Sequence, residues 1–296
     1  MLYHLFEYIQ ANYDLPGAGV FQYISFRAAA SVITSLICSM LIGKKVIEYL
    51  QLKQVGEIVR DLDLAGQIQK QGTPTMGGII ILSSILIPTI LFAQLDNVYV
   101  ILMIVTTVWL GIIGFIDDYI KVFKKDKEGL AGKFKIMGQI GISIIVACTL
   151  YFNDSVAVKD RLVSGGESIE TTIDGKLVKV QTSPVYAEAE HSLVTTIPFV
   201  KNNEFDYSSL LFFLGDKAKD WGWLVFIPIV IFIVTSVSNG ANLTDGLDGL
   251  ATGTSAIIGV TLAVFAYVSG NIIFADYLNI MYIPGSGELV VFISAF

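Results

Sequence analysis

Long stretches without a charged residue recur along this chain, and they limit its fold more than any other feature. A helix needs roughly 17 to 25 mostly apolar residues to cross a bilayer, and most of these stretches have about that length. They cover residues 28–43, 71–95, 97–116, 136–153, 221–244 and 249–275, and a further run begins at Leu289 and reaches Phe296. The sequence therefore predicts an all-α polytopic membrane protein with six complete transmembrane helices and the start of a seventh.

The composition excludes several other classes of protein. With 54% hydrophobic residues, 15% charged residues and a mean hydropathy of +0.68, the chain does not resemble a soluble domain. The net charge of −7 gives no indication of nucleic-acid binding. Cys38 and Cys148 each lie within an apolar run, so we expect no disulfide framework. Residues 1–21 contain no Lys or Arg, which indicates a retained anchor and not a cleaved signal peptide.

The basic residues predict the orientation in the membrane, because short cytoplasmic loops are enriched in Lys and Arg. Two connections are rich in them, and both are therefore placed in the cytoplasm: Lys44, Lys45, Lys53, Arg60 and Lys70 in the first, and Lys121, Lys124, Lys125, Lys127, Lys133 and Lys135 in the second. The N-terminal segment and the connections at 94–98 and 269–287 have none. We therefore expect the N-terminus to lie outside.

These patterns divide the chain into three parts. Helices one to four with their cytoplasmic loops occupy 1–153, an extracytoplasmic insertion occupies 154–220, and the remaining helices occupy 221–296. The insertion holds seven Lys or Arg and eleven Asp or Glu residues. Within it, residues 169–180 alternate around Asp174-Gly175, a pair typical of a type I′ β-hairpin. A solvated insertion, a cover over the helices and a docking segment all remain open interpretations.

Adjacent carboxylates close the apolar run that ends in GFIDDY. One carboxylate there could simply end a transmembrane helix at the water interface. Two neighbouring carboxylates, Asp117 and Asp118, repel one another unless a cation or several donors stabilise them. Mg²⁺ fits this chemistry, because it prefers oxygen ligands and often joins one or two carboxylates to a phosphate. The lysines that follow, Lys121, Lys124, Lys125 and Lys133, are placed to attract that phosphate.

Two further polar motifs reach the same predicted membrane face. In GTPTMGG, Thr73 and Pro74 are typical of a helix start, whose backbone N–H groups can bind an anion with Lys70 nearby. In NLTDGLDGLA, residues Asn242, Asp245 and Asp248 lie three apart and would share one side of a helical turn. Each motif could also be a structural cap. Their common location favours a single cytoplasmic site.

Together these motifs, with GLAGKFK after the acidic pair, resemble the phospho-N-acetylmuramoyl-pentapeptide transferase (MraY) family over most of 22–152 and 221–270. The resemblance implies transfer of phospho-MurNAc-pentapeptide from UDP-MurNAc-pentapeptide to undecaprenyl phosphate, which gives lipid I and UMP. It implies a Mg²⁺-dependent enzyme of the bacterial inner membrane that serves peptidoglycan synthesis, and with it cell shape and cell division. It also suggests a homodimer.

The resemblance further assigns roles to individual residues. Asp117 would engage or deprotonate the lipid phosphate with support from Asp118, and both are candidate metal ligands. Direct attack and a covalent aspartyl intermediate both remain open. Asp245 is the third candidate catalytic residue. The candidate substrate-binding residues, which would line the nucleotide pocket or contact phosphate, are Lys70, Thr75, Lys121, Lys125, Lys133, Asn242 and Asp248.

The sequence departs from the family in two respects. The resemblance places the main Mg²⁺ ligand and a histidine-rich loop in later helices, beyond Phe296. We therefore expect residues 1–296 to be a truncated product with little activity alone. The second departure is the insertion at 154–220, where a short connection is expected.

A transporter and a non-catalytic membrane scaffold are the two alternative functions. A transporter would keep its carboxylates within the membrane, whereas here every paired carboxylate lies at the predicted inner boundary. Thermal stabilisation by UDP-MurNAc-pentapeptide, and not by UDP-GlcNAc, would distinguish the transferase from both alternatives.

Overall fold

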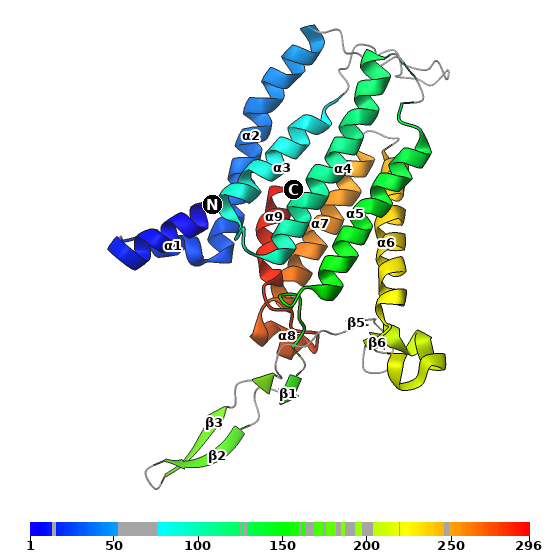
Figure 1. The fold of residues 1–296 in the computed structure, drawn as a ribbon. Helices are drawn as coiled ribbons and strands as arrows, with labels where there is room; N and C mark the ends of the chain where they lie inside the picture. Colours follow the sequence, from blue (N-terminus) through cyan, green and yellow to red (C-terminus); the bar gives the residue numbers. More distant parts are fainter. Residues whose placement is uncertain are drawn as a thin grey trace. The chain divides into compact units, whose positions relative to one another are not determined.

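The structure is a computed structural model of the chain (Figure 1). It describes residues 1–13, 16–52, 76–124, 126, 129–159, 161–163, 168–173, 176–181, 185–186, 193–196, 204–218, 220–245 and 249–296. The chain forms two compact units, one comprising Met1–Ile142 with Val291–Phe296 and the other Ser143–Val290.

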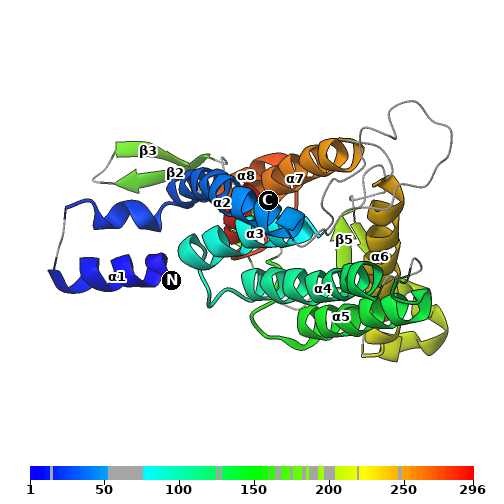
Figure 2. The ribbon, with the colours of Figure 1, turned by 90° about the horizontal axis from the view of Figure 1, so that it is seen from above.

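The first unit is built from helices. After α1 (Leu2–Tyr13) and the 3₁₀ helix η1 (Ala18–Gln22) come α2 (Ile24–Leu52), α3 (Gly78–Phe92), α4 (Val98–Phe123) and the beginning of α5 (Gly132–Phe152). Seen along the helices, α3 lies between α2 and α4 (Figure 2). The short helix α9 (Leu289–Ala295) is fastened to α2, because the hydroxyls of Ser31 and Ser35 donate to the carbonyls of Val291 and Ala295 at 3.0 and 2.6 Å.

Apolar packing at one end of these helices forms the core of the first unit. Phe92, Ala93, Val100 and Val291 are buried together, from the end of α3, the start of α4 and α9. Arg27 of α2 is buried beside this region with its guanidinium 4.7 Å from the ring centre of Tyr3, and it donates to the Phe92 carbonyl at 3.3 Å. A cation–π contact and a hydrogen bond are what allow such a charge to be buried.

Helix α4 begins directly after its capping residue and continues beyond the end of its apolar run. The Asn97 side chain accepts hydrogen bonds from the backbone N–H groups of Tyr99 and Val100 at 2.9 and 3.2 Å, which satisfies two donors of the first turn. The helix then extends to Phe123, so Asp117 and Asp118 lie inside its last turns and do not terminate it. The predicted end of this helix at Asp117-Asp118 was wrong, because the backbone hydrogen bonds of the helix continue to Phe123, after the apolar run has ended.

The second unit holds the rest of α5, six short strands, and helices η4 (Tyr207–Ala218), α6 (Trp223–Thr244), α7 (Leu250–Ser269), α8 (Ile272–Leu278) and η5 (Ser286–Glu288). The predicted single helix over 249–275 is therefore two helices. Helix α7 stops before Gly270, and the Asn271 side chain accepts from Ile273 N and Phe274 N at 3.0 and 3.3 Å, so it caps a new helix.

The predicted β-hairpin is confirmed by its strand pairing. Strands β2 (Ser168–Ile173) and β3 (Lys176–Gln181) pair antiparallel from Ser168↔Gln181 to Ile173↔Lys176. Asp174-Gly175, between the two strands, lies outside the described residues, so the type I′ turn stays a prediction. Two further pairs join β1 (Arg161–Val163) to β4 (Val185–Tyr186) and β5 (Val194–Thr196) to β6 (Glu204–Asp206).

Five helices within the described residues are long and apolar enough to cross a membrane: α2, α4, α5, α6 and α7. Five of the six predicted spans are thus present, although α2 extends well beyond 28–43 at both ends. The sixth, predicted over 71–95, corresponds to α3, whose 15 residues begin at Gly78 and not at Pro74. At 1.5 Å per residue it is roughly 22 Å long, shorter than the hydrocarbon core. The run predicted from Leu289 is α9.

Candidate functional site

Asp117 is the centre of a cluster of hydrogen-bond donors at the end of α4. Its Oδ2 atom lies 2.7 Å from Nζ of Lys121, one turn further along the same helix. Its Oδ1 atom lies 2.9 Å from Nζ of Lys135, which comes from the first turn of α5, and accepts from the backbone N–H of Leu130 at 2.8 Å. The Asp117 side chain is only 13% exposed. Two cations and a backbone donor therefore hold this carboxylate in one orientation.

Gly129 makes this arrangement possible. It has a φ of +68°, in the left-handed region that side chains disfavour. A Cβ atom at this position would lie 2.5 Å from Oδ1 of Asp117 and 2.7 Å from Cε of Lys121. The backbone before α5 can approach Asp117 this closely only because residue 129 has no side chain.

Asp118 faces a different side of α4. Successive residues of an α-helix are about 100° apart, so neighbouring side chains diverge. Asp118 lies at the edge of a groove between α3 and α4, and among the described residues it has no hydrogen-bond or ion-pair partner. The two carboxylates of the predicted acidic pair therefore lie in different environments. Asp117 faces the lysines, and Asp118 faces the apolar groove.

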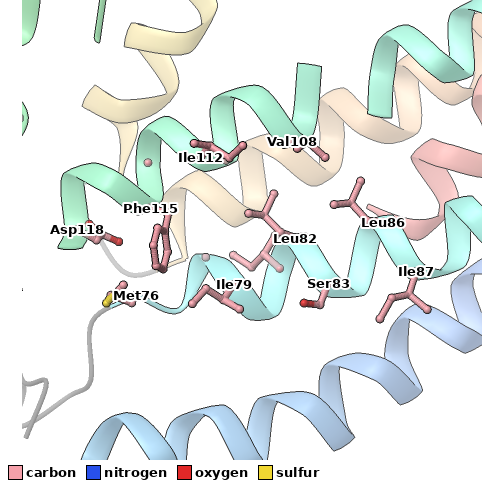
Figure 3. A pocket seen from close by; sticks show the side chains of 14 residues that line it. Met76, Ile79, Leu82, Ser83, Leu86, Ile87, Val108, Ile112, Phe115 and Asp118 are labelled. Atoms are coloured by element: carbon pink, nitrogen blue, oxygen red, sulfur yellow. The ribbon is translucent and has the colours of Figure 1, made fainter. Parts of the chain in front are cut away.

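The groove has a volume of about 650 Å³ and an almost wholly hydrocarbon lining. Figure 3 shows Asp118, Phe115 and Met76 at one end and Leu86, Ile87 and Val108 towards the other. Among the described residues that line it, the polar side chains are those of Ser83 and Asp118. Ten residues of α4 separate Val108 from Asp118, which corresponds to roughly 15 Å. The groove could hold an extended apolar chain with a polar group beside Asp118.

The other predicted site residues have different outcomes. Lys121 contacts Asp117, whereas Lys133 is exposed with its ammonium 5.3 Å from the centre of the Phe134 ring. Asn242 is exposed in α6 and Asp245 is the exposed residue after its end, both in the second unit. Since α6 ends at Thr244, a shared helical side for this motif is not supported. Four predicted residues lie outside the described ones: Lys70, Thr75, Lys125 and Asp248.

The sequence analysis missed Lys135 and Gly129 as site residues. Both belong to the GLAGKFK motif, and Lys135 is one of six lysines between residues 121 and 135. Nothing in their spacing selects Lys135 over Lys133, because the choice depends on where the loop turns at Gly129. A glycine six residues before a lysine was the only available signal.

The described residues fit a metal ion only in part. No group of three or more His, Cys, Asp or Glu side chains lies together among them. Asp118 offers a carboxylate, whereas both oxygens of Asp117 already accept from lysines. Mg²⁺ commonly uses one or two carboxylates, with substrate phosphates and water completing its shell. Asp118 is therefore the better fit of the predicted pair, and the Mg²⁺ site itself stays a prediction.

Comparison with known proteins identifies the family. The glycosyl transferase family 4 model matches residues 189–292, and signature 1 of the phospho-N-acetylmuramoyl-pentapeptide-transferases matches residues 70–82. The chain is 59% identical over 296 residues to the phospho-N-acetylmuramoyl-pentapeptide-transferase of Flavobacterium johnsoniae, covering 100% of this chain and 71% of that protein. The chain belongs to this family.

Two further phospho-N-acetylmuramoyl-pentapeptide-transferases are also similar to this chain over its whole length. The protein of Flavobacterium psychrophilum is 56% identical, with 100% of this chain and 71% of that protein covered. The protein of Parabacteroides distasonis is 55% identical, with 100% and 68% covered. Because these relatives align over the whole chain, the segment at 154–220 is shared with them and is not a departure from the family. The sequence resemblance, limited to 22–152 and 221–270, was too narrow.

Proposed function

We propose that this protein transfers phospho-MurNAc-pentapeptide from UDP-MurNAc-pentapeptide to undecaprenyl phosphate, giving lipid I and UMP for peptidoglycan synthesis. The observation that carries the proposal is the 59% identity, over all 296 residues, to a transferase of that name. Five apolar helices fit a multi-pass protein of the bacterial cytoplasmic membrane. By the distribution of lysines, its N-terminus lies outside and its active site faces the cytoplasm.

The groove between α3 and α4 supports a lipid acceptor. Its apolar lining suits an isoprenoid chain, and Lys121 follows Asp118 by three residues, about one helical turn, on α4. A phosphate beside Asp118 would meet cationic side chains while its chain remained in hydrocarbon. The acceptor can therefore bind with its reactive group at the predicted inner face and its tail along the groove.

Overall, the acceptor phosphate gains a P–O bond to the phosphorus that carries the sugar, and the bond between that phosphorus and the oxygen that leaves with UMP breaks. Direct attack and a covalent aspartyl intermediate both give this net change. Such transfers depend on positioning and on neutralising charge at the phosphate oxygens. Lys121 is suited to this, because its ammonium group already lies beside Asp117 at the end of α4. Mg²⁺, held by Asp118 and substrate oxygens, would supply further positive charge when bound.

Binding of the nucleotide tests this function against a transporter or a scaffold. We expect UDP-MurNAc-pentapeptide to raise the thermal unfolding temperature of the protein in detergent, and UDP-GlcNAc to raise it far less. A ligand at 100 times its Kd stabilises by about 2.7 kcal/mol, which is readily measured. Equal shifts from both nucleotides, or none, would contradict the proposal.

The homodimer stays a prediction, as do the roles in cell shape and division.

Filling the groove should weaken use of the lipid acceptor. Ile112 lines the groove and Val105 does not, although both are exposed β-branched residues of α4. We expect Ile112→Trp to raise the KM for undecaprenyl phosphate about tenfold, since loss of roughly two buried methylene contacts costs about 1.6 kcal/mol. Val105→Trp should leave that KM near its wild-type value.

Steady-state assays on the native full-length protein, with each substrate varied in turn, measure this effect. The KM for UDP-MurNAc-pentapeptide should be unchanged in both variants. An equal rise in the acceptor KM for Ile112→Trp and Val105→Trp would show that the groove is not the acceptor site. That result would not contradict the proposed transfer reaction.

A further inference from the structure

We propose that Lys135 is a positioning residue that fixes the Asp117 carboxylate and joins α4 to α5, an inference that rests on the proposed transfer reaction. The Lys135 ammonium lies 2.9 Å from Oδ1 of Asp117, and its side chain is 30% exposed. No role was assigned to Lys135 from the sequence, where Lys121, Lys125 and Lys133 were preferred.

The two carboxylate oxygens of Asp117 have different hydrogen-bond partners. Oδ2 accepts from Lys121, whereas Oδ1 accepts from Leu130 N and pairs with Lys135. A carboxylate whose oxygens both have directed donors cannot rotate freely about its last torsion. Charged hydrogen bonds of this kind are roughly twice as strong as neutral ones. The group therefore keeps one orientation before any substrate arrives.

Lys121 and Lys135 differ in what they connect. Lys121 lies four residues from Asp117 on the same helix and its side chain is 41% exposed, an arrangement that contributes little by itself. Lys135 belongs to α5 and reaches Asp117 across the loop that separates the two helices. Only the second contact fixes the position of α5 relative to the carboxylate.

The backbone conformation of the loop supports this reading. Gly129 adopts φ +68° directly against Asp117, and Leu130 then donates its N–H to Oδ1. The loop and the first turn of α5 thus supply two groups to the same oxygen. A lysine that only bound a substrate phosphate would not need a loop that brings a backbone N–H group and an ammonium group to the same carboxylate oxygen.

The test combines kinetics with thermal unfolding of the native full-length protein. We expect Lys135→Gln to lower kcat by about tenfold or more while both KM values change less than about twofold, because orientation is lost and binding contacts are not. Lys135→Arg should recover most of the activity, since its guanidinium also donates to a carboxylate. Lys45→Gln, an exposed lysine of α2, is the control and should behave as wild type.

A double-mutant cycle of Asp117→Asn and Lys135→Gln tests the contact independently of turnover. The combined variant should unfold at least about 2 °C above the temperature that additive effects predict. Additive unfolding temperatures, or a large rise in the KM for UDP-MurNAc-pentapeptide in Lys135→Gln, would overturn the inference. If the wild-type protein releases no UMP, the proposed function is wrong. The positioning role of Lys135 in that reaction is then wrong as well, even if the cycle shows that Asp117 and Lys135 interact.

Discussion

Replacing either member of the acidic pair should abolish transfer without preventing membrane insertion. We expect Asp117→Asn and Asp118→Asn to reduce UMP release by about 10²–10³-fold, the range seen when a group that stabilises reacting charge is removed. Asp117 is the anion around which two lysines are ordered, and Asp118 is the carboxylate at the end of the groove. The substitutions keep the size of the side chain, remove its charge and replace one acceptor oxygen with an NH₂ donor.

The same assay extends to the second unit. Asp245→Asn should give a comparable loss if the exposed carboxylate after α6 acts in the same reaction. Membrane fractionation and an unfolding curve for each variant check insertion and folding. Turnover close to wild type in the variants of the acidic pair would refute the site, since Asp118 lines the groove and Asp117 pairs with the two lysines.

Adding a single methyl group at Gly129 should also have a large effect. An L-residue at φ +68° costs roughly 1–2 kcal/mol, and the new Cβ would lie 2.5 Å from Oδ1 of Asp117. The loop must move away from α4 to relieve this overlap, so the Leu130 and Lys135 contacts are lost together. We expect Gly129→Ala to lower the unfolding temperature by several degrees, by roughly 2–4 °C per kcal/mol, and to lower kcat about tenfold or more.

Gly132→Ala is the matched control for this prediction. Gly132 is the first residue of α5, and a Cβ there would meet no atom within 4 Å. Alanine also favours helix formation over glycine, so this variant should be as stable and as active as wild type. If the two alanine variants behave alike, the close approach of residue 129 to Asp117 has no functional importance.

Much of the fold was predictable, because apolar runs of bilayer length determine where helices form. The hairpin around Asp174-Gly175 was predictable for a local reason, since this pair suits a tight turn. Helix α1 was missed because its 12 residues form too short a run to span a membrane. The break between α7 and α8 was missed because Asn271 reads as part of an apolar run, although its side chain caps a new helix.

The surroundings of the acidic pair were predictable only in part. Adjacent carboxylates followed by lysines indicated phosphate and metal chemistry, which stays a prediction, and the structure places Asp117 beside two of these lysines and Asp118 at the groove. The partners were harder to predict. Lys121 follows from helical spacing, whereas Lys135 depends on the positive φ of Gly129, a tertiary feature that residue spacing does not encode.

Labelling of single cysteines tests the predicted orientation most directly, namely that Asp118 and Asp245 both lie at the cytoplasmic face of the membrane. Cysteines would replace Asp118 and Asp245 one at a time in a protein lacking Cys38 and Cys148, and a membrane-impermeant maleimide would be applied from either side. We expect both positions to react only from the cytoplasmic side. Reaction of the two positions from opposite sides of the membrane would contradict the claim.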